Sequence, residues 1–474
     1  MAVKLCDLAN EVLSLIAEQL EGDTESLQAL RGTSSRFRAI AEPVLYRHLF
    51  FRDYDKITSL VPFLLQPDSP SRLKAVHSID ARPQEGGHRA GPEHLVSILG
   101  RTPNLKELTF EMAGINQRLY KKGAWSRFDE RDILAPIIDS ALSQEIPSAP
   151  PARTLPVLKK LTLHLSGNSI RARYWNIDDE SCRIFAHPSI EEMHLSCANI
   201  TRDFQHVLLR FGKTPLKRLT LTECDIGHTA LSALLEKPRA LEYLYLGESA
   251  NHYGQRSSPE NYLLERNATA FLAALGQQKH SLKQFCYRPK GVLLSVTMPD
   301  DAGLSSFEVL DTVSMECAFP ELQEMITSEK TRPPNLTTIN LRDYHGAIQN
   351  QSSLMNHDLE EDNGNISPLM FLCQRTSKMK SLKQINVTTN DIFGNGTLPV
   401  PEQVVVEGAE LSLQPRGVRL TVSCRAYPHS AIPPYLEGEP TPTDQLVFDS
   451  QLPGGWLDAG CRWSVLGSSG WTPL

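Results

Sequence analysis

The chain has 474 residues, of which 41% are hydrophobic and 22% are charged, and its formal net charge is -7. This length allows two to four domains with cores of ordinary size. The negative balance argues against general affinity for nucleic acid or for an anionic membrane, because both require concentrated positive charge. No run approaches the roughly twenty apolar residues that a membrane helix needs. We therefore expect neither a nucleic-acid nor a membrane partner.

Cysteine usage and the first residues indicate the compartment. The nine cysteines are spread from Cys6 to Cys461 without a C-x-x-C pair. This spacing favours free thiols in a reducing compartment over a disulfide framework or a zinc site. Asp7, Glu11 and Glu18 interrupt any signal-peptide core. The expected location is the cytoplasm, the nucleus or both.

The spacing of apolar residues predicts three short helices between Leu5 and Phe51. Asn10 is the expected N-cap of the first helix, Gly22 its end and Gly32 the end of the second. The third begins at Ser34 or Ser35 and is broken or kinked at Pro43. The apolar side chains recur at three- and four-residue intervals: Leu8, Val12, Leu13, Ile16, Leu20, Leu27, Leu30, Phe37 and Ile40. Three short helices cannot bury so much apolar surface alone, so this segment requires a packing partner.

This ordered set of residues resembles an F-box. The match runs through Leu8-Ala9-Asn10-Glu11-Val12-Leu13, Ile16, Leu20, Leu27, Leu30, Ser34-Ser35-Arg36-Phe37-Arg38 and Leu45-Tyr46-Arg47. Family members usually have proline where this chain has Ala9. The resemblance implies binding to a Skp-type adaptor through Leu8, Val12, Leu13, Ile16, Leu20, Leu27, Leu30 and Phe37. The residues alone leave open a second reading, a small helical cap on a larger domain.

A helical connector is expected over residues 52–71, and a different pattern follows it. The motif L-x-x-L-x-L, the mark of a leucine-rich-repeat strand, begins at Leu105, Leu158, Ile190, Leu216, Leu241, Leu282, Leu304, Leu336 and Leu382. The copy at Leu216 continues through Cys224, which takes the place of the usual turn asparagine. Such units bury their leucines only by stacking on one another. Residues 72–425 are therefore expected to form one irregular solenoid with a parallel concave sheet.

Helices and loops fill the intervals between these strands. Helices are expected from Pro92 to Leu99, Arg202 to Phe211, Thr229 to Glu236 and Ala268 to Leu275. The uneven spacing predicts inserted loops at Ala113–Pro151, Gly247–Asn267 and Tyr344–Pro368. The last of these contains an acidic run, 358–365, which is more typical of a solvated loop than of a calcium site. A closing strand is expected at Val418–Val422, and residues 426–474 are predicted to be a partly disordered tail rich in Pro, Gly and Ser.

The search for chemistry finds no catalytic motif, and no enzyme activity, cofactor or metal site is expected. The sequence has no G-x-S-x-G, G-x-x-x-x-G-K or H-E-x-x-H motif. His164 and His194 occupy what we take to be equivalent strand positions. A metal pair there is conceivable, but surface histidines on a binding face are the more common case. A nucleophile and base brought together only by folding are not excluded by sequence.

A repeat face that binds protein is the favoured reading. In L-x-x-L-x-L the leucines point inward and the intervening residues face outward. Tyr and Arg are enriched at interface hot spots, and Arg218, Tyr243 and Tyr245 fall at outward positions of consecutive repeats. We predict that these residues form one target-binding patch, with His194 and Arg342 as further contacts. The alternative is an ordinary solvated sheet surface.

Together these patterns predict an α/β chain, with a three-helix F-box at 1–51 followed by the repeats. The resemblance to F-box/leucine-rich-repeat proteins implies a non-catalytic substrate receptor of an SCF (Skp–cullin–F-box) ubiquitin ligase. Such a receptor binds the cullin-RING ligase through its adaptor and holds an unidentified protein target. Its whole contribution is to keep the target close to the ubiquitin-charged enzyme. The runner-up is a repeat scaffold that binds a protein without delivering it for ubiquitination.

Overall fold

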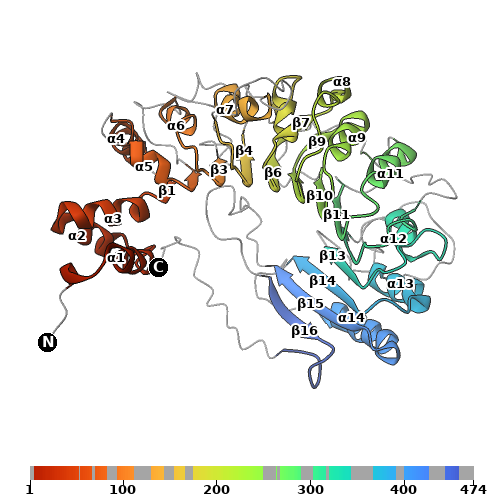
Figure 1. Ribbon diagram of the computed structural model, residues 1–474. Coiled ribbons are helices and arrows are strands. Elements are labelled where there is room, and N and C mark those ends of the chain that lie inside the picture. Colours follow the sequence, from red (N-terminus) through yellow and green to blue (C-terminus); the bar gives the residue numbers. More distant parts are fainter. Residues whose placement is uncertain are drawn as a thin grey trace. The chain divides into compact units, whose positions relative to one another are not determined.

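The computed structural model describes residues 5–52, 54–66, 70–82, 93–111, 130–142, 154–165, 174–248, 263, 267–289, 303–316, 320–342, 367–390, 400–425 and 444–457. These residues fall into two compact units, which we call unit 1 (up to Arg239) and unit 2 (from Ala240 on). Both are α/β, with mostly parallel strands and helices (Figure 1). Among the described residues, no helix has the length and apolar character needed to cross a membrane.

Unit 1 begins with helices and continues with strands. Its first elements are η1 (Leu5–Asp7), α1 (Asn10–Gln19), α2 (Thr24–Thr33), α3 (Ser35–Leu45), β1 (His48–Phe51), α4 (Tyr54–Leu64), α5 (Pro70–Ala75), β2 (Ser78–Ala81), α6 (Glu93–Leu99) and β3 (Glu107–Glu111). Then come α7 (Glu130–Leu142), β4 (Lys160–His164), β5 (Trp175–Asn176), η4 (Ser181–Ala186), β6 (Glu192–Ser196), β7 (Ala198–Ile200), α8 (Gln205–Leu208), β8 (Arg218–Thr222), β9 (Asp225–Ile226) and α9 (His228–Glu236).

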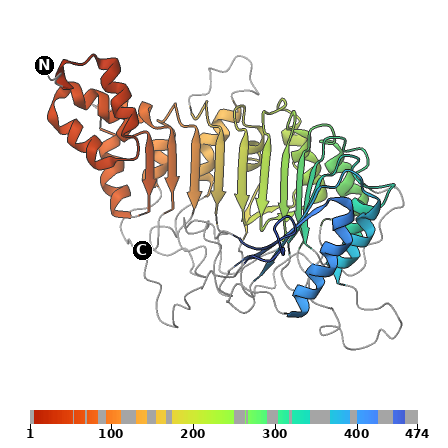
Figure 2. The ribbon, with the colours of Figure 1, turned by 90° about the horizontal axis from the view of Figure 1, so that it is seen from below.

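Six strands of unit 1 pair in parallel in the order β1-β2-β3-β4-β6-β8 (Figure 2). The second and fourth residues of each five-residue strand are buried; in β8 these are Leu219 and Leu221, both 0% exposed. We call this side the helix face, because the helices cover it. The first, third and fifth residues form the other side, which we call the polar face. The predicted inward direction of the leucines is confirmed.

A small parallel sheet, β5-β7-β9, lies beyond the ends of the main strands of unit 1. The chain reaches β7 and β9 through turns at Cys197 and Glu223, both with positive φ (55° and 54°). Cys224 is buried, and its Sγ lies 3.7 Å from the carbonyl oxygen of Leu195 on the preceding strand. Cys224 therefore connects this turn to the end of β6.

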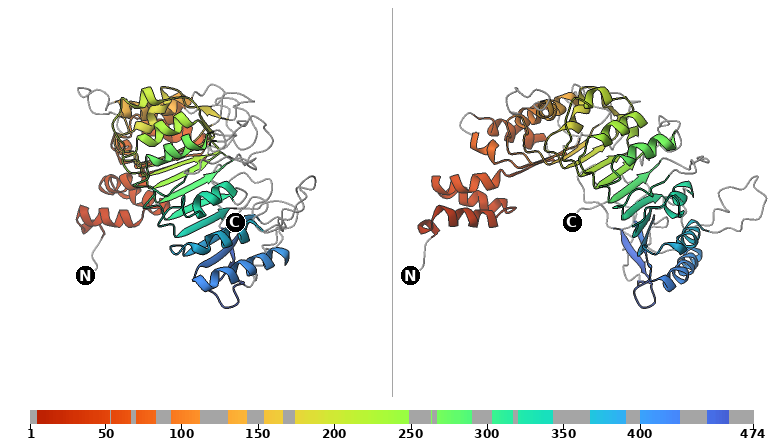
Figure 3. Two further views of the ribbon diagram at one scale, coloured as in Figure 1. Left: turned by 90° about the vertical axis from the view of Figure 1, so that its right-hand side faces the viewer. Right: turned by 45° about the vertical axis from the view of Figure 1, so that its right-hand side comes forward.

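Unit 2 repeats the alternation of strands and helices. Its elements are β10 (Tyr243–Gly247), α11 (Ala268–Gly276), β11 (Gln284–Arg288), β12 (Thr312–Glu316), α12 (Pro320–Thr327), β13 (Thr338–Arg342), α13 (Pro368–Arg375), η6 (Thr376–Lys378), β14 (Gln384–Asn390), α14 (Val400–Leu413), η7 (Gln414–Arg416), β15 (Arg419–Arg425) and β16 (Gln445–Asp449). Strands β10 to β15 pair in parallel, and β16 pairs antiparallel with β15. Helices α12, α13 and α14 lie on one face of these strands (Figure 3).

Several expected boundaries differ from the structure. The repeat expected at Leu304–Val309 is wrong: that segment is not a strand, Val309 is 40% exposed, and the strand is Thr312–Glu316. Leu304 and Phe307 are buried, but as part of a turn that precedes the strand. The spacing L-x-x-L-x-L is met instead by Leu310, Val313 and Met315, each 0% exposed.

Other elements were missed. Strands β1 and β2 precede the first expected repeat, and β1 lies within the segment expected to hold only helices. The loop expected at Ala113–Pro151 contains α7, and the expected helix at Arg202–Phe211 shrinks to Gln205–Leu208. Strand β15 does not close the sheet, since β16 lies in the expected tail. The acidic run and the loops at 249–262 and 343–366 lie outside the described residues.

The end of the described chain is held by side chains. Trp456 packs edge-on against Phe448 of β16 with 4.9 Å between ring centroids, and its Nε1 donates to Glu407 Oε1 of α14 at 3.2 Å. Arg419 of β15 forms an ion pair with Asp449 of β16. Trp463 and Trp471 lie outside the described residues.

Candidate functional site

The three N-terminal helices share a core of their own. Ala17, Leu27, Ala41 and Val44 are buried against one another, and Leu20, Leu30, Ile40 and Leu45 pack around them. Ser34 caps α3 by accepting the Phe37 N–H, and Asp23 caps α2 by accepting the Ser26 N–H.

The expected ends of these helices are partly wrong. Asn10 is the first helical residue and not the N-cap, and its Oδ1 accepts a hydrogen bond from Arg36 Nε at 2.8 Å. Gly32 and Pro43 lie inside α2 and α3, which continue to Thr33 and Leu45. Packing of the shared core outweighs the local preference of glycine and proline to end a helix.

The expected adaptor-binding residues divide into two groups. Leu13, Leu27 and Phe37 are 1%, 2% and 8% exposed, and Leu20 and Leu30 pack against the shared core. Leu13, Leu27 and Phe37 are buried inside the bundle and stabilise it, whereas Leu20 and Leu30 are half-buried at the edge of its core. Val12 is 41% exposed, while Leu8 and Ile16 are half-buried. The surface-accessible part of the predicted set is therefore small.

An exposed apolar strip on α1 is the surface that remains. Leu15, which the sequence analysis did not select, is 60% exposed and follows Val12 by one turn. Leu5 of η1 is 45% exposed. At 100° per residue, the inward and outward apolar side chains of α1 together span about half of its circumference, more than packing on one side requires. We call Val12 and Leu15 the α1 strip.

Arg36 of α3 holds the start of this surface in place. Its Nη1 donates to the carbonyl oxygen of Cys6 at 2.7 Å, and its Nη2 donates to that of Leu8. With the bond to Asn10, one guanidinium fixes the chain between η1 and α1. Arg36 therefore binds the chain both just before α1 and at its first residue, and this fixes how α1 lies against α3.

A charged and aromatic cluster joins the bundle to the rest of unit 1. Glu42 of α3 lies 3.0 Å from Arg31 of α2 and 3.4 Å from Arg72 of α5. The Arg72 guanidinium stands 4.1 Å from the ring centroid of Phe63 on α4. The expected connector, 52–71, thus holds α4 and the start of α5 and is tied to the bundle by these contacts.

The expected target-binding residues of unit 1 do not form a surface of free side chains. His194 Nε2 lies 2.9 Å from Thr222 Oγ1, and burial lowers the pKa of His194 to about 4. Arg218 is exposed at the first position of β8. The assumed equivalence of His164 and His194 is wrong, because His194 pairs with Thr162 in the register and His164 pairs with Ser196. His164 is also buried, 4% exposed.

In unit 2, Tyr245 is a buried residue of the polar face. It is 9% exposed, its hydroxyl accepts a hydrogen bond from Arg288 Nη1 at 3.3 Å, and burial raises its pKa. Tyr243 and Arg342 are half-buried. Arg218 belongs to the other unit. Tyr245 is therefore buried and held by Arg288 of the neighbouring strand, and its role in target binding stays a prediction.

Sequence reasoning also missed a polar row in unit 2. Ser314, Asn340, Asn386 and Thr421 are the third residues of β12, β13, β14 and β15, and hydrogen bonds join them in turn. The signal in the sequence is a polar amide or hydroxyl between the two buried apolar residues of each strand, for example Asn340 between Ile339 and Leu341. We call these four residues the amide row.

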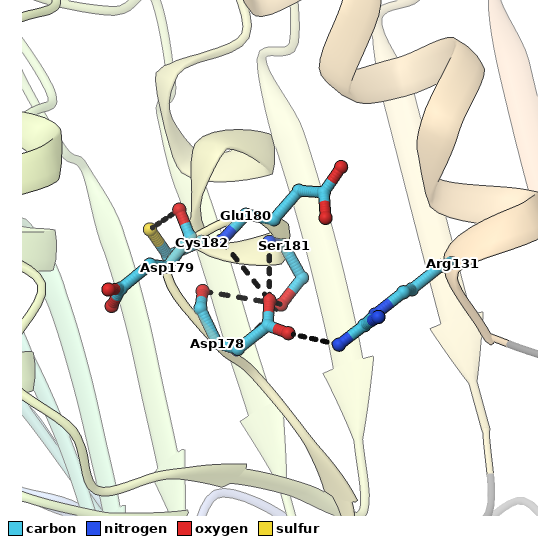
Figure 4. A network of polar contacts seen from close by, with 6 residues as sticks. All are labelled: Arg131, Asp178, Asp179, Glu180, Ser181 and Cys182. Atoms are coloured by element: carbon cyan, nitrogen blue, oxygen red, sulfur yellow. Dashed lines mark hydrogen bonds and ion pairs between the residues drawn. The ribbon is translucent and has the colours of Figure 1, made fainter.

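Acidic residues near η4 form a structural network (Figure 4). Asp178 Oδ1 accepts from the Ser181 N–H and hydroxyl, both at 2.8 Å, and Oδ2 lies 3.0 Å from Arg131 Nη2 of α7. Burial tends to raise the pKa of Asp178, but these hydrogen bonds together hold it below its ordinary value. The network fastens α7 to η4.

The part of the chain that the structure describes was also searched for metal-ligand clusters and reactive cysteines. No three His, Cys, Asp or Glu side chains gather there as a metal site requires. The cysteines among these residues are free, all of them buried except Cys6. Burial raises the pKa of Cys182 and Cys373 to about 12, which makes these thiols poor nucleophiles.

Comparison with known proteins adds no family. No family model matches the chain, and no curated protein matches it. Function has to be argued from the residues of the chain itself.

Proposed function

We propose that this protein is a substrate receptor of an SCF-type ubiquitin ligase. Its N-terminal bundle binds a Skp-type adaptor, and the polar faces of its strands hold a protein target. The receptor performs no chemistry, since holding the target near the ubiquitin-charged enzyme raises its effective concentration. A cytoplasmic or nuclear location fits this role.

The observation that carries the proposal is the α1 strip. Val12 and Leu15 remain 41% and 60% exposed although the bundle has a complete core behind them. Burial of an apolar side chain contributes about 1.5–3 kcal/mol, so contact of a partner with these two residues would stabilise a complex. The order and spacing of the F-box-like residues favour a Skp-type adaptor as the partner.

The rigid attachment of the bundle supports the same function. The Arg31–Glu42–Arg72 cluster connects α2, α3 and α5, and β1 follows α3 with only Tyr46 and Arg47 between them. An adaptor bound at α1 would be held at a defined position relative to the first strands of unit 1.

Affinity capture of the full-length protein from cells treated with a cullin inhibitor tests the proposal. The inhibitor should retain adaptor and target together, and the target should accumulate in whole-cell samples. A variant with Val12→Glu and Leu15→Glu should lose the adaptor and cullin but keep the target. Retention of the adaptor without any cullin-dependent turnover of the captured protein would instead identify a non-degradative scaffold.

A further inference from the structure

The amide row is a continuous chain of side-chain hydrogen bonds across four neighbouring strands of unit 2. Asn340 Nδ2 donates to Ser314 Oγ at 2.9 Å, and Asn386 Nδ2 donates to Asn340 Oδ1 at 2.7 Å. The Thr421 hydroxyl donates to Asn386 Oδ1. The strand register places these residues directly opposite one another. The row therefore holds its side chains in fixed orientations on the polar face.

The row retains hydrogen-bonding capacity. A primary amide has two N–H donors, and the described contacts of Asn340 and Asn386 use one donor each. Both residues are half-buried, so their remaining donors can be reached from solvent. Neighbouring strands are about 4.8 Å apart. The row thus places two oriented donors on neighbouring strands, where the oxygen atoms of a bound partner segment can accept from them.

An arginine stands beside the row, and none of the described carboxylates forms an ion pair with it. Arg342 is the last residue of β13, two positions after Asn340 on the same face. It is half-buried, and its guanidinium makes no side-chain hydrogen bond or ion pair with the residues that the structure describes. Charged groups that lose water without gaining a partner are costly. A guanidinium in this state is a ready receptor for a carboxylate or phosphate.

The same face holds a second, anchored arginine. Arg288 is 8% exposed and donates to the hydroxyl of Tyr245 on the adjacent strand. Arg342 is close enough to Tyr245 to oppose the rise in its pKa. Glu316 ends β12, which lies between the strands that end in Arg288 and Arg342. Arg288 is thus held by Tyr245, which leaves Arg342 as the guanidinium that a ligand of this face can pair with.

We propose that this face of unit 2 binds an extended acidic segment of a partner protein. A carboxylate of that segment pairs with Arg342, and its backbone carbonyl oxygens accept from Asn340 and Asn386. A single available guanidinium matches one carboxylate better than a phosphate dianion, which generally draws a cluster of cations. The inference rests on the proposed receptor function in one respect: it names the chemistry of the target.

Fluorescence anisotropy of labelled peptides on the full-length protein tests this inference. The probes are a twelve-residue peptide of alternating Glu and Ser, the same peptide with Gln in place of Glu, and the Gln peptide with its serines phosphorylated. The Glu peptide should bind at least tenfold more tightly than the Gln peptide at low salt, and Arg342→Gln should abolish that difference. Asn340→Ala should weaken both peptides alike, because it removes backbone contacts.

Lys380→Gln is the matched control, since it removes one exposed positive charge just before β14 and should leave the preference intact. Thermal melting checks that each variant is folded. Equal binding of the Glu and Gln peptides, or an unchanged preference in Arg342→Gln, would overturn the inference. Tighter binding of the phosphorylated peptide would overturn the carboxylate assignment. Adaptor binding, measured on the same samples, reports on the proposed function separately.

Discussion

At the scale of single residues, α1 makes opposite demands on neighbouring side chains. Leu13 is 1% exposed, whereas Val12 is 41% exposed. We expect Leu13→Ala to lower the free energy of unfolding by about 2–5 kcal/mol, because it leaves a cavity. Val12→Ala should change it by less than about 1 kcal/mol. Denaturant unfolding of full-length variants measures both. Similar losses at the two positions would mean that α1 is rotated relative to the structure.

His187 makes stability depend on pH. It is 1% exposed, its Nδ1 accepts from the Ser189 N–H, and burial lowers its pKa from 6.5 to about 3. Below about pH 6.5 the His187 imidazole is protonated in the unfolded chain but stays neutral in the folded chain. The free energy of unfolding therefore falls as the pH drops from 6.5 towards 3. Between pH 7 and pH 5 the wild type should lose about 2 kcal/mol more than His187→Asn. Equal losses in the two proteins would show that His187 is accessible to protons.

Residue identity alone did not reveal which polar-face residues are buried. Tyr245 and His164 alternate correctly with the leucines, as predicted, but they are 9% and 4% exposed. Their burial depends on residues distant in sequence, such as Arg288 beside Tyr245. Periodicity assigns a side chain to a face, and only the packing of other segments decides whether that face meets water.

At the scale of elements, the L-x-x-L-x-L spacing predicted most strands of both units. It missed strands in which other apolar residues take the place of leucine. Strand β1 fits the same spacing with Tyr46, Leu49 and Phe51, and β2 fits it with Val76, Ile79 and Ala81; these six residues are buried. Helix α7 carries buried residues at helical intervals, at Ile133, Leu134, Ile137, Ile138 and Ala141. Its place within a long insertion concealed this pattern. Strand β16 was missed because prolines and glycines surround it.

The corrected position of β12 can be tested by charge substitution. Val313 is 0% exposed on the helix face, whereas Val309 is 40% exposed before the strand. Val313→Asp should destabilise unit 2 by several kcal/mol, because an unpaired carboxylate would enter the core. Val309→Asp should be tolerated within about 1 kcal/mol. Thermal melting with limited proteolysis distinguishes the two. A well-folded Val313→Asp protein would favour the original assignment of the strand to Leu304–Val309.

At the scale of the whole molecule, each unit presents a different kind of surface. Unit 1 offers the apolar α1 strip on a bundle with a complete core, and unit 2 offers the amide row with Arg342. The proposed receptor would use two such surfaces, one for its ligase and one for its target. Of the first surface, the F-box-like pattern selected Val12 but not Leu15. The second depends on hydrogen bonds between distant strands, which spacing alone does not reveal.

Direct binding of the purified full-length chain to a purified Skp-type adaptor is the most decisive measurement. Isothermal titration should give a one-to-one complex with a Kd below about 1 μM, equivalent to more than about 8 kcal/mol. Val12→Glu with Leu15→Glu should weaken it at least a hundredfold without changing the melting temperature, and the exposed control Gln28→Glu should leave it unchanged. A folded wild-type chain that fails to bind the adaptor, or a double variant that binds as tightly as the wild type, would contradict the assignment of this protein as a ligase receptor docked through α1.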